Sequence, residues 1–134
     1  MCRQAASAMP KTITRTTRIY AKALDALKAV ATVKAAAHIT GGGFYENLPR
    51  ALPEGFAAKI EKRTLRILPI FELLQKTGDI PERDMFNTFN MGVGMAVVVS
   101  AVQADAAIRA LVSAGEKAYI MGEIAKGGEG VLLC

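Results

Sequence analysis

Residues 38–50, HITGGGFYENLPR, place three consecutive glycines shortly after the only histidine of the chain. The glycine run forces a break in regular structure, because glycine is the most flexible residue. Residues 33–40, VKAAAHIT, are short and apolar and predict a buried strand, with continuation of the preceding helix as the alternative. Residues 44–52, FYENLPRAL, predict about two helical turns limited by Pro49. The sequence therefore predicts a strand-to-helix turn at residues 41–43.

This turn has a structural interpretation and a functional one. Backbone N–H groups and partial positive charge at a helix start can bind a phosphate, and glycine lets the ligand approach closely. Polar residues near the turn add candidate contacts, namely His38, Thr40, Asn47 and Arg50. The pattern is neither the Walker motif nor the dinucleotide fingerprint, and Glu46 with Arg50 also fits a solvated i,i+4 pair. Both interpretations stay open at this point.

Length and composition favour one domain with a real core, because the 134 residues are 51% hydrophobic. No apolar stretch reaches the roughly 20 residues that span a bilayer, and the first residues lack the apolar centre of a signal peptide. These features predict a cytoplasmic protein without a membrane partner. Residues 1–16 are expected to form an irregular lead-in, and residues 17–134 the domain.

The formal net charge of +5 favours an anionic partner. The basic residues form no dense cluster, and Arg15, Arg18 and Lys22 are typical of a solvated face, so we expect no nucleic-acid partner. Cys2 and Cys134 lie at opposite ends without metal-ligand spacing, which predicts free thiols, or a terminal disulfide, and no metal site. A phosphorylated small molecule is the expected ligand class.

The rest of the chain alternates between helical and extended patterns. Helices are predicted over residues 20–30, 69–76, 81–87 and 102–114. Strands are predicted over residues 56–62, 92–100, 117–124 and 131–134. The connections vary in length, which favours an α+β (mixed α/β) fold with a mixed β-sheet covered by helices.

Three local patterns refine this prediction. One face of the first helix gathers the apolar residues Ala23, Leu24, Leu27 and Val30. Ser100 and Gln103 have the spacing of a capping box before the last helix. The strand over residues 92–100 lacks strict alternation, so both of its faces are expected to be covered.

A second polar stretch, FNTFNMGVGM, covers residues 86–95. The amides of Asn87 and Asn90 can donate and accept, which suits a polar ligand. Gly92 and Gly94 permit close packing or a bulge. Taken alone, this stretch favours a structural role.

Together, three stretches resemble the C-terminal domain of the phosphoribosylformylglycinamidine cyclo-ligase (AIR synthetase) family in order and spacing. They are HITGGGFYENLPRALP, ILPIFELLQKTGDIPERDMFNTFNMGVGM and AYIMGEI. A fourth stretch, TRIYAK, resembles the segment that enters this domain. The resemblance runs over residues 17–125, and it implies that residues 17–134 are an AIR synthetase C-terminal domain with the fold of that family.

The resemblance also implies an activity. The family uses ATP and Mg²⁺ to close the imidazole ring of formylglycinamidine ribonucleotide in de novo purine biosynthesis. The formyl oxygen is phosphorylated, an internal nitrogen attacks, and phosphate leaves as aminoimidazole ribonucleotide forms. The family's N-terminal ATP-binding domain supplies most of the ATP and Mg²⁺ site and the main dimer contact, and it has no counterpart in these 134 residues. We therefore expect a piece of a longer protein or a shortened gene product, inactive alone, with no tightly bound cofactor.

By position, the resemblance implies that His38, the catalytic candidate, lines an interdomain cleft with the substrate- or phosphate-binding residues Thr40, Gly41, Gly42 and Gly43. Asn47 and Arg50 are second choices for binding, and Asn87 and Asn90 are expected to flank the site as further binding residues. The expected partners are a phosphorylated small-molecule substrate, the N-terminal domain and a second copy in a homodimer. Two alternatives stay open. One is a related ATP-dependent enzyme, of the small-molecule kinase or selenophosphate synthetase type. The other is a non-catalytic phosphate-ligand-binding or assembly module.

Overall fold

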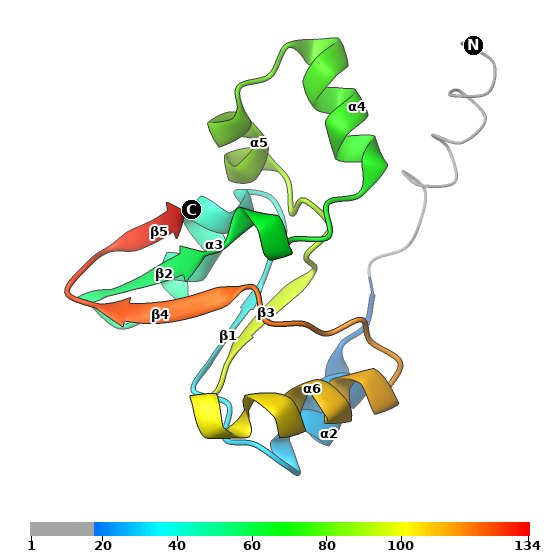
Figure 1. Cartoon of the computed structure of the whole chain (residues 1–134), viewed down its shortest axis with the longest axis vertical. Helices are drawn as coiled ribbons and strands as arrows, with labels where there is room; N and C mark the ends of the chain where they lie inside the picture. The colour runs from blue at the N-terminus through cyan, green and yellow to red at the C-terminus, as the bar shows by residue number, and fades with distance from the viewer. Residues whose placement is uncertain (1–17) are drawn as a thin grey trace.

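The computed structural model describes residues 18–134 (Figure 1). The α-helices in this range are α2 (Ala21–Lys28), α3 (Gly43–Arg50), α4 (Pro69–Gly78), α5 (Glu82–Thr88) and α6 (Ala104–Ser113), with single 3₁₀ turns η1 (Lys62–Thr64) and η2 (Ala101–Gln103). The strands are β1 (Ala35–His38), β2 (Phe56–Ile60), β3 (Met95–Val98), β4 (Gly122–Lys126) and β5 (Gly130–Leu133). The predicted lead-in over residues 1–16, including Cys2 and Arg15, lies outside the described residues.

The strands of the described range form two sheets, and this combination with helices confirms the α+β class. β1 pairs antiparallel with β3, in a register that sets His38 opposite Met95. The second sheet has the order β4-β2-β5, and it is mixed because β2 runs antiparallel to β4 and parallel to β5. The expected mixed sheet therefore exists, but β1 and β3 form a ribbon of their own.

Two hydrophobic clusters hold these elements together. The larger one lies between α3, α5 and the two sheets, and its largest fully buried side chains are Ile39, Phe44, Met85 and Phe86. The smaller one joins α2 to α6 through Leu27 and Ala107. In Figure 1, α2 and α6 lie at one end of the β1–β3 ribbon, and α4 and α5 lie at the other.

Strand β3 contacts both clusters, as its unbroken apolar run predicts. Ala96 belongs to the larger cluster, while Val97 packs against the smaller one. The strand is nevertheless shorter than residues 92–100. Met91 and Gly92 have positive φ angles of 51° and 97°, and the Val93 N–H donates to the Asn90 carbonyl, so a turn precedes the strand.

Three further sequence predictions were wrong in detail. The strand expected over residues 117–124 is β4, Gly122–Lys126. Tyr119 and Met121 precede it and pack on the larger cluster, and the Met121 carbonyl accepts a single hydrogen bond from the Glu61 N–H at 2.9 Å. No capping box forms, because Ser100 Oγ donates to Gln103 Oε1 at 2.8 Å and the turn η2 intervenes before α6. Val30 is 46% exposed, because α2 ends at Lys28 before the predicted face is complete.

Candidate functional site

The predicted strand-to-helix turn is present: β1 ends at His38 and α3 begins at Gly43. Gly42 and Gly43 adopt left-handed φ angles of 90° and 54°, which favour glycine. A Cβ on Gly43 would overlap the carbonyl oxygen of Phe86 and lie 2.9 Å from that of Phe89. The packing therefore requires glycine at position 43, because only a residue without a Cβ lets α3 and α5 approach this closely.

Gly41 is different from its two neighbours. Its φ lies outside the left-handed region, and a Cβ added there would meet no heavy atom within 4 Å. Nothing in the packing of the described residues requires glycine at this position. An unhindered backbone at the rim of a turn is what a ligand needs for close approach.

The backbone N–H groups of the turn are only partly used within the protein. The Gly43 N–H donates to the Thr40 carbonyl at 3.1 Å, and the Glu46 N–H donates to the Gly42 carbonyl as the helix ladder begins. Within residues 18–134, no hydrogen bond uses the N–H groups of Gly41, Gly42, Phe44 and Tyr45. Phe44 is fully buried, so its N–H is closed to a ligand, and the donors that a ligand can reach are those of Gly41, Gly42 and Tyr45. These three lie at the positive end of the α3 dipole, so the turn can accept an anion.

The predicted ligand contacts Asn47 and Arg50 have partners inside the protein. Asn47 Nδ2 donates to the carbonyls of Gly41 and Gly43, at 3.2 and 2.7 Å, and so braces the turn. Arg50 donates to Glu46 Oε2 at 3.1 Å in an exposed i,i+4 pair. That same oxygen would lie 2.6 Å from a Cβ on Gly42, which places a carboxylate at the mouth of the turn.

The second polar stretch lies against the first. β3 pairs with β1, the Ile39 N–H donates to the Gly94 carbonyl at 2.9 Å, and the rings of Phe44 and Phe86 meet edge to face at 5.5 Å. Asn90 Oδ1 accepts from the Gly92 N–H at 3.0 Å, so its carboxamide oxygen stabilises its own loop. Asn87 is exposed on α5 and makes no side-chain hydrogen bond within residues 18–134.

The exposed His38 ring meets the ring of Tyr20 edge to face, with centroids 5.9 Å apart and planes at 72°. Sequence reasoning did not place Tyr20 beside His38, although Tyr20 lies within the stretch TRIYAK that carries part of the resemblance. Burial raises the pKa of the Tyr20 hydroxyl, Glu116 raises it further and Arg18 opposes them, so the phenol is neutral near pH 7.

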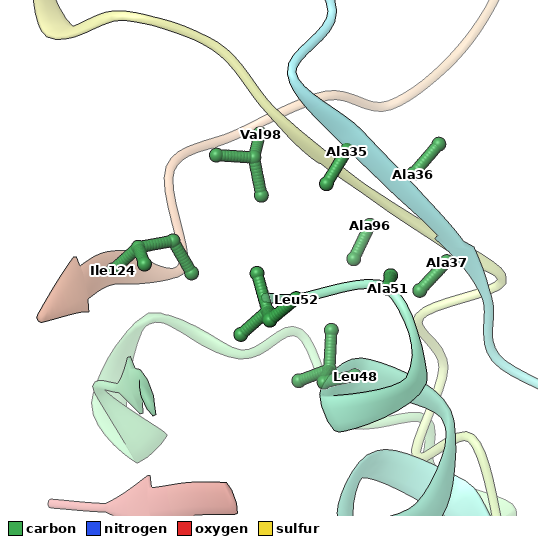
Figure 2. Close-up of a pocket in the computed structure, with 9 residues that line it drawn as sticks. All are labelled: Ala35, Ala36, Ala37, Leu48, Ala51, Leu52, Ala96, Val98 and Ile124. Atoms are coloured by element: carbon green, nitrogen blue, oxygen red, sulfur yellow. The ribbon is translucent and has the colours of Figure 1, made fainter. Parts of the chain in front are cut away.

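An apolar pocket lies between the β1–β3 ribbon and the end of α3 (Figure 2). Its lining consists entirely of aliphatic side chains, from Ala35, Ala36, Ala37, Leu48, Ala51, Leu52, Ala96, Val98 and Ile124. Without a polar group in its lining, this pocket cannot hold a phosphate. The candidate anion site is therefore the open glycine turn and not this pocket.

Residues 18–134 contain no group of three or more His, Cys, Asp or Glu side chains that could hold a metal ion. None of the helices formed by these residues is long and apolar enough to cross a membrane.

Comparison with known proteins identifies the family. The family described as AIR synthase related protein, C-terminal domain, matches residues 3–134. This chain belongs to that family. Phosphoribosylformylglycinamidine cyclo-ligase of Lachnoclostridium phytofermentans is 54% identical over 119 residues, which cover 88% of this chain and 35% of the relative. The enzymes of the same name from Thermoanaerobacter sp. strain X514 and Bifidobacterium longum subsp. infantis are 50% and 48% identical, over 87% and 81% of this chain.

The resemblance inferred from the sequence motifs is confirmed by these matches. The chain spans about a third of the length of the curated relatives. The family match takes in both the glycine turn and the second polar stretch, which the fold brings into contact.

Proposed function

We propose that this chain is the C-terminal domain of an ATP-dependent ring-closing ligase that converts formylglycinamidine ribonucleotide to aminoimidazole ribonucleotide in de novo purine biosynthesis. The observation that carries the proposal is the 54% identity over 119 residues to a cyclo-ligase of that name. The unused N–H groups at the glycine turn support it, because the substrate is a phosphorylated small molecule.

The proposed reaction has two steps. The γ-phosphoryl group of ATP passes to the formyl oxygen and ADP leaves, which converts a poor leaving group into phosphate. The ring-forming nitrogen then attacks the same carbon, the carbon–oxygen bond breaks with its electron pair going to phosphate, and the nitrogen loses a proton. In this scheme the turn from Thr40 to Tyr45 holds a phosphate group, and His38 accepts the proton or stabilises the phosphorylated intermediate.

ATP and Mg²⁺ are assigned to another part of the enzyme. Mg²⁺ prefers carboxylate and phosphate oxygens, and residues 18–134 gather no carboxylate cluster. The proposal therefore places Mg²⁺ and most ATP contacts on the part of the relatives that this chain does not match, and it treats that part as the partner domain. The chain alone would then be inactive, and its location in the cytoplasm and its assembly into a homodimer remain predictions.

A chimeric enzyme tests the proposal. The matched 119 residues of the Lachnoclostridium enzyme would be replaced by the corresponding stretch of this chain, with the unaltered enzyme as control. We expect ATP-dependent ring closure from the chimera and none from the isolated chain. A folded chimera without ring closure would contradict the proposal. ADP release that requires a different phosphoryl acceptor would instead indicate a small-molecule kinase.

A further inference from the structure

We infer that Tyr20 is a positioning residue, which fixes the ring of His38 at the rim of the glycine turn. The relevance of this contact to catalysis rests on the proposed role of His38. The contact itself does not depend on that role, because it follows from the packing of Tyr20, His38 and Gly94.

His38 lacks the usual means of fixing an imidazole. It is exposed at the end of β1, and its ring makes no hydrogen bond with residues 18–134. The Tyr20 ring meets it edge to face at 5.9 Å, the arrangement that aromatic pairs prefer. This contact is therefore the restraint that the structure shows on the His38 ring.

The backbone around Tyr20 is restrained by one hydrogen bond and one ion pair. Its carbonyl accepts from the Leu24 N–H at 2.9 Å as α2 begins, so its backbone is tied to the helix. Two residues earlier, Arg18 forms an ion pair with Glu116, which follows α6. Since α2 and α6 pack together, the segment that carries Tyr20 is attached to a fixed helix pair.

The Tyr20 side chain packs directly against the backbone of Gly94. A Cβ on Gly94 would overlap the Tyr20 hydroxyl, so the hydroxyl occupies the space that any other residue would fill. The carbonyl of the same glycine accepts from the Ile39 N–H, directly after His38. Gly94 therefore contacts both the Tyr20 side chain and the backbone of Ile39, the residue that follows His38.

Charge does not explain the contact. Burial raises the pKa of the Tyr20 hydroxyl, so the ring faces His38 as a neutral phenol near pH 7. The ring rather than the hydroxyl is then the part that matters to His38. Phenylalanine at this position should preserve the effect, and an aliphatic residue should remove it.

NMR on the whole 134-residue chain gives a direct test, because its single histidine has an unambiguous ring signal. In the wild type and in Tyr20→Phe, we expect nuclear Overhauser contacts between the two rings and one dominant His38 rotamer. In Tyr20→Leu and in Gly94→Ala, we expect averaged His38 rotamers in a folded chain. Gly41→Ala is the matched glycine control, because its Cβ meets nothing within 4 Å, and it should leave the His38 rotamer unchanged.

The outcomes separate this inference from the proposed function. A single fixed His38 rotamer in folded Tyr20→Leu, or the absence of ring–ring contacts in the wild type, would overturn the positioning role whatever the enzyme activity. In an active chimera, Tyr20→Leu should lower kcat by about 10- to 100-fold with little change in KM, as misplaced catalytic groups do, and Tyr20→Phe should restore it. An inactive chimera would refute the proposed function and leave the NMR test intact.

Discussion

The three glycines of the turn should respond differently to alanine, and this difference separates the demands of the fold from those of a ligand. Gly43 combines a φ of 54° with a Cβ position that overlaps the Phe86 carbonyl oxygen. A left-handed alanine costs roughly 1–2 kcal/mol. Overpacking against a backbone group that must move costs about 1–3 kcal/mol more. Gly43→Ala should therefore destabilise the chain by roughly 2–5 kcal/mol.

The two preceding glycines provide the matched controls. Gly42→Ala carries the cost of its φ of 90°, about 1–2 kcal/mol, but its steric neighbour is the flexible Glu46 side chain, which can move away. Gly41→Ala has neither cost, so its stability should equal or exceed that of the wild type.

Urea unfolding followed by circular dichroism measures the free energy of unfolding of each variant. Since a domain of this size is stable by about 5–15 kcal/mol, Gly43→Ala should shift the midpoint strongly or prevent folding. Equal losses at Gly41 and Gly43, or a loss at Gly43 below about 1 kcal/mol, would refute the steric argument.

Three other changes test the site from different directions. Glu46→Gln removes a carboxylate from the mouth of the turn, and should tighten phosphate binding about threefold by titration calorimetry, while the lost pair with Arg50 costs only about 0.3–0.5 kcal/mol. Unchanged or weaker binding would contradict this. Asn47→Ala removes both bonds that brace the turn and should lower the free energy of unfolding by about 1–3 kcal/mol in the same urea assay. The Tyr20 pKa is raised in the folded state, so its contribution to stability is full below the ordinary value of 10.0 and is lost as the pH rises above it. Urea midpoints measured from pH 8 to 11 should therefore fall less in Tyr20→Phe than in the wild type, and parallel curves would show that Tyr20 plays no part.

The sequence predicted those parts of the fold that depend on local patterns. The break at residues 41–43, the helix after it and the strand before it all follow from composition over a few residues. The strand at residues 117–124 was misplaced because Tyr119 and Met121 are partly buried against the larger cluster from outside β4, and an apolar pattern does not distinguish a strand from an irregular segment that packs on the core.

The arrangement of the site depends on contacts between distant residues, which single-sequence patterns do not reveal. Gly43 meets Phe86 because α5 packs on α3, and the Tyr20 hydroxyl meets Gly94, 74 positions along the chain. The sequence identified Asn47 by its polarity and position. Only the structure shows that its amide is used to brace the turn.

The most direct test of the account is a phosphate titration of the ¹⁵N-labelled chain, followed by NMR and compared with chloride at the same ionic strength. We predict that the amide signals of Gly41, Gly42 and Tyr45 shift together and saturate with one dissociation constant, because their N–H groups are the unused donors of the turn that are not buried. We also predict a smaller shift for Gly43, whose N–H already has a partner. Signals that do not saturate, or shifts spread over the exposed lysines and equal in chloride, would contradict the claim that this turn binds phosphate.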